Sequence, residues 1–165
     1  MPNEVDIRWW LGATIVVAII GAYLAAVVQY GVPRSRRDAA KVAQAVGIGF
    51  GLGFASGGIP LVLTYFPTME SYDPWISLGF WVAPFFAGLY WGKVRPEVPW
   101  AGAVTLELGF LAVILADIIA RISLNIPTTV WPLALMWILP VSTAIVVSGV
   151  FLGRATWRFF GGRGV

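Results

Sequence analysis

The stretch "AGAVTLELGFLAVILADIIARISL", residues 101–124, contains the two features that decide the fold of this chain. Nearly all of its residues are apolar, and it is longer than the roughly 20 residues with which a helix crosses about 30 Å of hydrocarbon. It also carries three charged side chains, Glu107, Asp117 and Arg121. We therefore expect a membrane-spanning helix with one polar side.

The whole chain has the composition of a membrane protein. Of its 165 residues, 59% are hydrophobic and 12% are charged, and the mean hydropathy is +0.83. A soluble domain needs more polar surface than this. The chain has no cysteine and no histidine, which excludes disulfides, the usual zinc and haem ligands, and Ser-His or Cys-His catalytic pairs. We expect no cofactor, no metal site, no catalytic residue and no enzymatic activity.

Five apolar segments predict an all-α bundle with five membrane spans. They cover about residues 9–31, 42–66, 75–92, 101–124 and 130–153, joined by short loops. None of them shows the alternation in segments of about 10 residues that is typical of a membrane β-barrel. The sequence therefore predicts a single integral membrane domain over residues 1–165.

Loop charges predict the orientation of the bundle, because Lys and Arg accumulate on the cytoplasmic side. The first loop, the third loop and the C-terminal tail are basic, whereas the N-terminus and the second loop are acidic. We expect the N-terminus outside, the C-terminus in the cytoplasm, and a prokaryotic plasma membrane as the location. The basic side comprises Arg34, Arg36, Arg37, Lys41, Lys93, Arg95, Arg154, Arg158 and Arg163.

An offset of 56 residues suggests an internal repeat of two hairpins, residues 45–92 and 101–148. The offset aligns Trp75, Trp81 and Pro84 with Trp131, Trp137 and Pro140, which is a shared W-x5-W-x2-P pattern. Parallel repeats of this kind are typical of transporters, although not confined to them. The alternative is two ordinary helical hairpins.

The three charged residues of the fourth span share one side of a helix. At 100° per residue they fall within a sector about 80° wide. Asp117 and Arg121 are four residues apart, the spacing at which an acid and a base meet on a helix surface. They form either a structural ion pair near the outer interface or a charged entrance to a pathway.

Glu107 lies deeper, about 10 Å inside the cytoplasmic end of the span and about 15 Å from Asp117 along the axis. A charge at the bilayer centre costs at least about 2.5–3.5 kcal/mol, so such residues face the bundle interior or a wet cavity. An unpaired carboxylate at this depth is expected to take up a proton. Glu107 is therefore either an ion- or proton-handling group or a buried, hydrogen-bonded structural carboxyl.

The second span contains "GIGFGLGFASGGIP", residues 47–60, in which small residues recur every four positions. This spacing predicts close packing between helices. The alternative is a helix interrupted near its outer third, with freed carbonyls that line a cavity. The candidate packing or cavity residues are Gly47, Gly51, Gly53, Gly57, Gly58 and Pro60.

Two functions fit these features. The first is a homo-oligomeric transporter or channel for an ion or small solute, with Glu107, Asp117 and Arg121 along its pathway. The alternative is a non-catalytic accessory subunit of a larger respiratory or transport complex. The expected partners are the lipid bilayer and either further copies of the chain or other membrane subunits. The tail "RATWRFFGGRGV" suits an anionic membrane surface, and its three arginines are too few to predict nucleic-acid binding.

Overall fold

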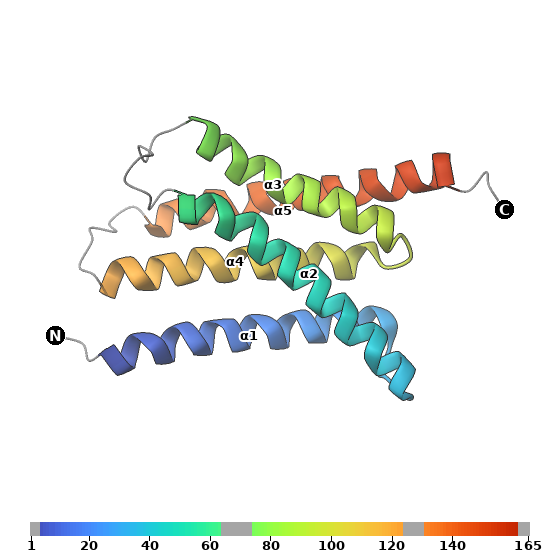
Figure 1. The fold of residues 1–165 in the computed structure, drawn as a ribbon, viewed down its shortest axis with the longest axis horizontal. Helices are drawn as coiled ribbons and strands as arrows, with labels where there is room; N and C mark the ends of the chain where they lie inside the picture. The colour runs from blue at the N-terminus through green and yellow to red at the C-terminus, as the bar shows by residue number, and fades with distance from the viewer. Residues whose placement is uncertain (1–3, 64–73, 124–130, 162–165) are drawn as a thin grey trace.

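The computed structural model describes residues 4–63, 74–123 and 131–161, and all the regular secondary structure within these ranges is helical. The five long helices alternate in direction, so that α1, α3 and α5 point one way and α2 and α4 the other (Figure 1). A five-residue π-helical segment, η1, extends α5. The helices are α1 (Glu4–Tyr30), α2 (Arg36–Leu63), α3 (Pro74–Val94), α4 (Pro99–Ser123), α5 (Trp131–Thr156) and η1 (Trp157–Gly161).

Local signals set the ends of α1 and α2. The Gly31 N–H bonds to the Val27 carbonyl (2.8 Å) with φ at +82°, a conformation that glycine adopts readily and that ends α1. Ser35 Oγ accepts a hydrogen bond from the Asp38 N–H (3.1 Å) and donates one to Asp38 Oδ2 (2.8 Å), which caps the start of α2. Because of this cap, α2 begins at Arg36 rather than near residue 42 and includes a charged first turn.

Four helical segments in the described part of the chain are long and apolar enough to cross a membrane, which confirms the all-helical membrane class. They are Trp9–Tyr30, Arg36–Leu61, Pro99–Ile122 and Met136–Phe160. The remaining helix, α3, is 21 residues long but is not among them. The outward surface is strongly apolar, as at Val17 (68% exposed) and Val28 (83% exposed) on α1. Helices with such surfaces suit an environment of lipid rather than water.

Helix α4 lies at the centre and contacts all four other long helices. Its fully buried side chains include Leu106 and Phe110, and Trp91 of α3 packs into the same core. The most extensive contacts join α3 to α5 and α2 to α4. Helix α1 packs against α4 and α2 through Ala22 and Ala26, both with no exposed surface.

Glycines bring the helix backbones together in both major contacts. A Cβ at Gly53 of α2 would overlap the Leu106 carbonyl of α4, and one at Gly109 of α4 would overlap the Phe50 carbonyl of α2. Neither position meets its own counterpart 56 residues later: Gly53 meets the counterpart of Phe50, and Phe50 meets the counterpart of Gly53. In the contact of α3 with α5, Gly88 meets Val146 and Gly149 meets Phe85 in the same reciprocal way. The duplication of the hairpins stays a prediction.

The alternative of a helix break at Gly57, Gly58 and Pro60 is wrong. Helix α2 runs through all three positions to Leu63, with Pro60 inside it. A proline removes one backbone hydrogen bond, here the one to the carbonyl of residue 56. Near the end of a membrane helix this loss is tolerated, because side chains and neighbouring helices satisfy the freed group.

Candidate functional site

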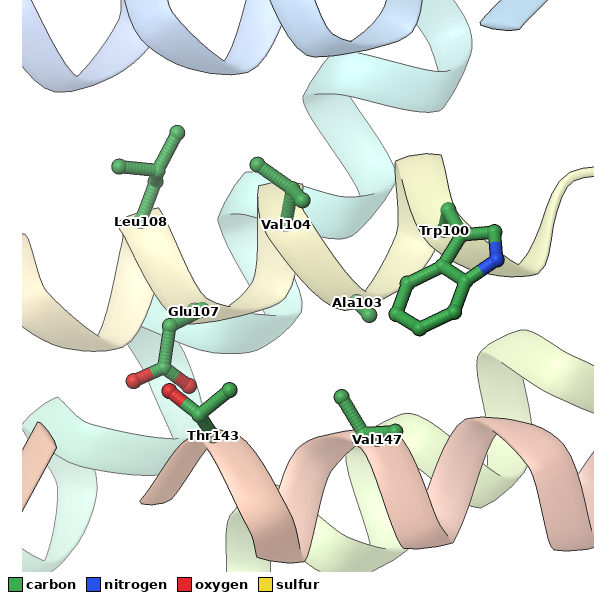
Figure 2. A pocket seen from close by; sticks show the side chains of 7 residues that line it. All are labelled: Trp100, Ala103, Val104, Glu107, Leu108, Thr143 and Val147. Carbon is green, nitrogen blue, oxygen red and sulfur yellow. The ribbon is translucent and has the colours of Figure 1, made fainter. Parts of the chain in front are cut away.

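The carboxylate of Glu107 points from α4 toward α5 and is the centre of the candidate site (Figure 2). Glu107 as a whole is half-buried. Ser142 of α5, which has no exposed surface, donates a hydrogen bond from Oγ to Glu107 Oε1 at 2.6 Å. The other oxygen, Oε2, is buried and has no hydrogen-bond partner among the described residues. One half of the carboxylate is therefore held in place by Ser142, and the other half is buried near the Thr143 hydroxyl without a hydrogen bond of normal geometry.

Ser142 is positioned by its own helix as well as by Glu107. Its hydroxyl lies 3.1 Å from the Leu139 carbonyl, one turn earlier in α5. Since a serine hydroxyl has a single proton, it bonds either the carboxylate or this carbonyl at a given moment. The shorter distance to Glu107 Oε1 and the charge of the carboxylate favour the bond between the helices.

A cavity of about 180 Å³ adjoins the carboxylate between α4 and α5. The cavity is half open to the outside, and its exposed wall is almost wholly apolar. Glu107 and Thr143 are its two residues with oxygen-bearing side chains, and the Thr143 hydroxyl lies close to the carboxylate in Figure 2. The rest of the wall is apolar apart from the indole of Trp100 and consists of Trp100, Ala103, Val104, Leu108 and Val147.

Asp117 and Arg121 form the ion pair that their spacing predicts. Arg121 Nε lies 2.8 Å from Asp117 Oδ2, and the side chains are 37% and 14% exposed, respectively. The structure does not join this pair to Glu107, since Asp117 follows Glu107 by ten residues, or about 15 Å along α4. The pair is thus a separate feature at the other end of the helix, and its role along a pathway stays a prediction.

The candidate residues of α2 differ in how closely other helices pack against them. Gly53 and Gly57 lie in the contact with α4, and a Cβ at Gly57 would be 2.9 Å from Phe110 Cδ2. Gly58 is looser, with Val113 Cγ2 at 3.8 Å, and Pro60 is buried. At Gly47 and Gly51 a Cβ would meet nothing within 4 Å, and both residues are exposed. None of the six candidates on α2 lines the Glu107 cavity.

Sequence reasoning missed Ser142, Thr143 and Trp100 as neighbours of Glu107. The available signal was the pair of adjacent hydroxyl residues, Ser142 and Thr143, within an apolar span. A polar pair in a membrane helix points to a partner in a neighbouring helix. That signal does not say which helix is the neighbour, because α4 and α5 meet only in the folded bundle.

The site is chemically simple. The described residues contain no group of three or more His, Cys, Asp or Glu side chains that could hold a metal ion. Glu107 supplies the charge, while Ser142 and Thr143 supply hydroxyl groups. This set can bind, hold and release a proton, and it offers few oxygens for the coordination of a dehydrated cation.

Comparison with known proteins identified no relative of this chain. No protein-family model, no curated protein and no solved structure matches the chain.

Proposed function

We propose that the chain is a five-span transporter or channel of the membrane, with Glu107 as its proton-handling group. The observation that carries this proposal is the state of the Glu107 carboxylate. One oxygen is fixed by Ser142, and the other is buried, has no partner among the described residues and adjoins a cavity. A carboxyl group that only stabilised the fold would be expected to have both oxygens paired.

A proton fits this arrangement better than a metal cation. The open oxygen can accept a proton without any further ligand, and a neutral carboxyl is cheaper to bury in a membrane than a carboxylate. A cation such as Na⁺ or Ca²⁺ would have to exchange its water for several protein oxygens. The exposed wall of the cavity is almost wholly apolar, so it provides no such set of oxygens.

The proposal includes five spans with the N-terminus outside and the C-terminus in the cytoplasm. Helix α3, with 21 residues, has the length that a crossing requires. It is also strongly apolar and contacts α2, α4 and α5, and its exposed side chains, such as Leu78 (51%) and Phe86 (59%), suit contact with lipid. The basic loops support the orientation, because positive charge is retained in the cytoplasm.

The proposal further includes a homo-oligomer, since the cavity in one chain adjoins two helices and is too small to form a complete path. The exposed Gly47 and Gly51 support an additional helix contact on α2. The same surface fits a helix of a different protein, so an accessory subunit of a larger complex is the second candidate. The mass of the complex purified in a mild detergent distinguishes the two.

The test compares Glu107→Gln with Glu97→Gln in liposomes. Glu97 lies between α3 and α4 with its side chain 53% exposed, so it serves as a matched control. An internal pH dye reports proton entry driven by a potassium diffusion potential. We expect Glu107→Gln to reduce entry to the level of liposomes without protein, and Glu97→Gln to behave as the wild type.

A spectroscopic measurement covers the case in which proton movement requires an unidentified solute. Infrared difference spectra between acidic and alkaline pH contain carbonyl bands from every carboxyl group that takes up a proton. The component that belongs to Glu107 is the band that Glu107→Gln removes and Glu97→Gln keeps. An unchanged band together with unchanged proton entry in Glu107→Gln would remove Glu107 from the mechanism.

A further inference from the structure

A second groove lies at the far end of α5, where the helix continues into η1. It has a volume of about 540 Å³ and is lined by Phe151, Arg154, Ala155, Arg158 and Phe159. It shares no lining residue with the Glu107 cavity. Two arginines four positions apart thus share a groove with two phenylalanine rings.

The arginines of this groove have charge that the described residues do not neutralise. The ion pairs of the described chain are Arg95 with Glu97 and Arg121 with Asp117, so neither Arg154 nor Arg158 takes part in one. Arg154 Nε is buried and has no hydrogen-bond partner among the described residues. A buried N–H of a charged group without an acceptor is costly, so this atom points to an anionic ligand.

The surroundings of the arginines are those of a membrane interface. Next to them, Trp157, Phe159 and Phe160 are 45%, 68% and 86% exposed. Aromatic side chains beside arginine at the end of a membrane helix are typical of the headgroup layer. A soluble anion would not require these apolar neighbours, whereas the acyl chains of a lipid would contact them.

We propose that Arg154 and Arg158 bind the phosphate of an anionic phospholipid, with its acyl chains against Phe151 and Phe159. Guanidinium groups match the geometry of phosphate oxygens and can donate two hydrogen bonds to them. The end of α5 carries a partial negative charge of about half a unit from its backbone dipoles. Two full positive charges outweigh it.

The experiment is a lipid titration of delipidated protein in detergent, followed by native mass spectrometry. The lipids are phosphatidylglycerol, which is anionic, and phosphatidylcholine, which has the same phosphate but no net charge. Glycerol phosphate is added as a competitor that has the headgroup chemistry without acyl chains. The variants are the double variant Arg154→Gln/Arg158→Gln, the single variant Arg158→Gln, and the control Arg34→Gln/Arg36→Gln.

We expect the wild type to bind phosphatidylglycerol more tightly than phosphatidylcholine, with little competition from glycerol phosphate. Each arginine of the groove should contribute about fivefold to the affinity through its hydrogen bonds to the phosphate, so the double variant should lose about 25-fold. The control has the same change of charge at exposed positions before and at the start of α2 and should keep wild-type affinity. Arg158→Gln alters an exposed side chain, so its loss of about fivefold is measurable even if the double variant misfolds.

Three results would overturn the proposal. Equal binding of the two lipids would show that the groove does not recognise net charge. An equal loss in the control would show that the lipid responds only to the overall charge of the protein. Full competition by glycerol phosphate would assign the groove to a soluble phosphate compound instead of a lipid.

Discussion

The contact of α4 with α2 differs from its contact with α5 in the atoms that lie between the helices. Toward α2, backbone meets backbone, since Gly53 and Gly109 face the carbonyls of Leu106 and Phe50 with no room for a Cβ. Toward α5, the side chains of Glu107 and Ser142 stand between the helices, and a cavity remains beside them. One side of α4 is therefore densely packed, and the other side carries unfilled space and an unpaired oxygen.

The side of α4 that faces α2 therefore stabilises the bundle, and the side that faces α5 carries the candidate site. Lipid tails are as apolar as leucine, so membrane helices gain little from hiding apolar surface and associate through close packing and hydrogen bonds. The contact of α2 with α4 uses close packing. The contact of α4 with α5 uses a hydrogen bond at the candidate site, which leaves space for a ligand and makes this contact the weaker of the two.

The largest effect is expected from Gly53→Ala or Gly109→Ala, which place a methyl group against the backbone of the opposite helix. Either change should lower the free energy of unfolding in detergent by about 1–3 kcal/mol or more, because the helices must move apart. Gly12→Ala on α1, where a Cβ meets nothing within 4 Å, is the matched control. It should leave stability unchanged or raise it by up to about 1 kcal/mol. Equal losses at positions 12 and 53 would show that the close contact is not the source of stability.

The next largest effect should be an increase in the free energy of unfolding, not a decrease. Glu107→Leu removes the buried unpaired oxygen and fills part of the cavity, so it should raise the free energy of unfolding by about 1–3 kcal/mol. Ser142 keeps the Leu139 carbonyl as its acceptor. Chemical denaturation in detergent measures the change, and Glu97→Leu at an exposed position is the control. A Glu107→Leu protein less stable than the wild type would make Glu107 a structural residue.

A smaller effect is expected where α1 supports the start of α4. Gln29 Oε1 accepts a hydrogen bond from the Ala101 backbone N–H at 2.7 Å, which satisfies a donor in the first turn of α4. Gln29→Ala should therefore lower the free energy of unfolding by about 1 kcal/mol. Gln44→Ala, which removes a hydrogen bond to the exposed end of Arg95, should change it by less than about 0.5 kcal/mol. A similar result for both variants would contradict a capping role for Gln29.

The smallest effect concerns the ion pair at the other end of α4. A double-mutant cycle with Asp117→Asn and Arg121→Gln should give a coupling energy of about 0.5 kcal/mol, because both side chains are partly exposed and four residues apart. Added salt should reduce this coupling. A coupling energy above about 2 kcal/mol would instead place the pair in a dry environment and give it a role like that of Glu107.

Much of the helical framework follows from the sequence, and the pairing of its surfaces does not. The five apolar segments lie where the five long helices form, and the spacing of Asp117 and Arg121 predicted their ion pair correctly. Packing at Gly53 and Gly57 was also predicted. Nothing in the sequence distinguished these glycines from Gly47 and Gly51, which have the same spacing but face away from every described helix.

The hydrogen-bond partner of Glu107 is a second feature that the sequence alone could not predict. Its hydrogen-bond donor is Ser142, 35 residues later in the chain, and no local pattern connects the two. The depth of Glu107 in an apolar span indicated that it needs a partner. The packing of α4 against α5 determined that this partner is a hydroxyl group that leaves one oxygen open.

The sequence by itself determined the properties that depend on neighbours along the chain. These are the apolar length of each helix, the charges of the loops and the pairing of residues four apart, and the last of them follows from the 3.6-residue period of the helix. Only the tertiary structure decided which helix faces meet, because in an apolar environment every smooth face has similar affinity for lipid and for protein. Shape and hydrogen bonding between helices make that choice, and both require atoms from distant parts of the chain to be in contact.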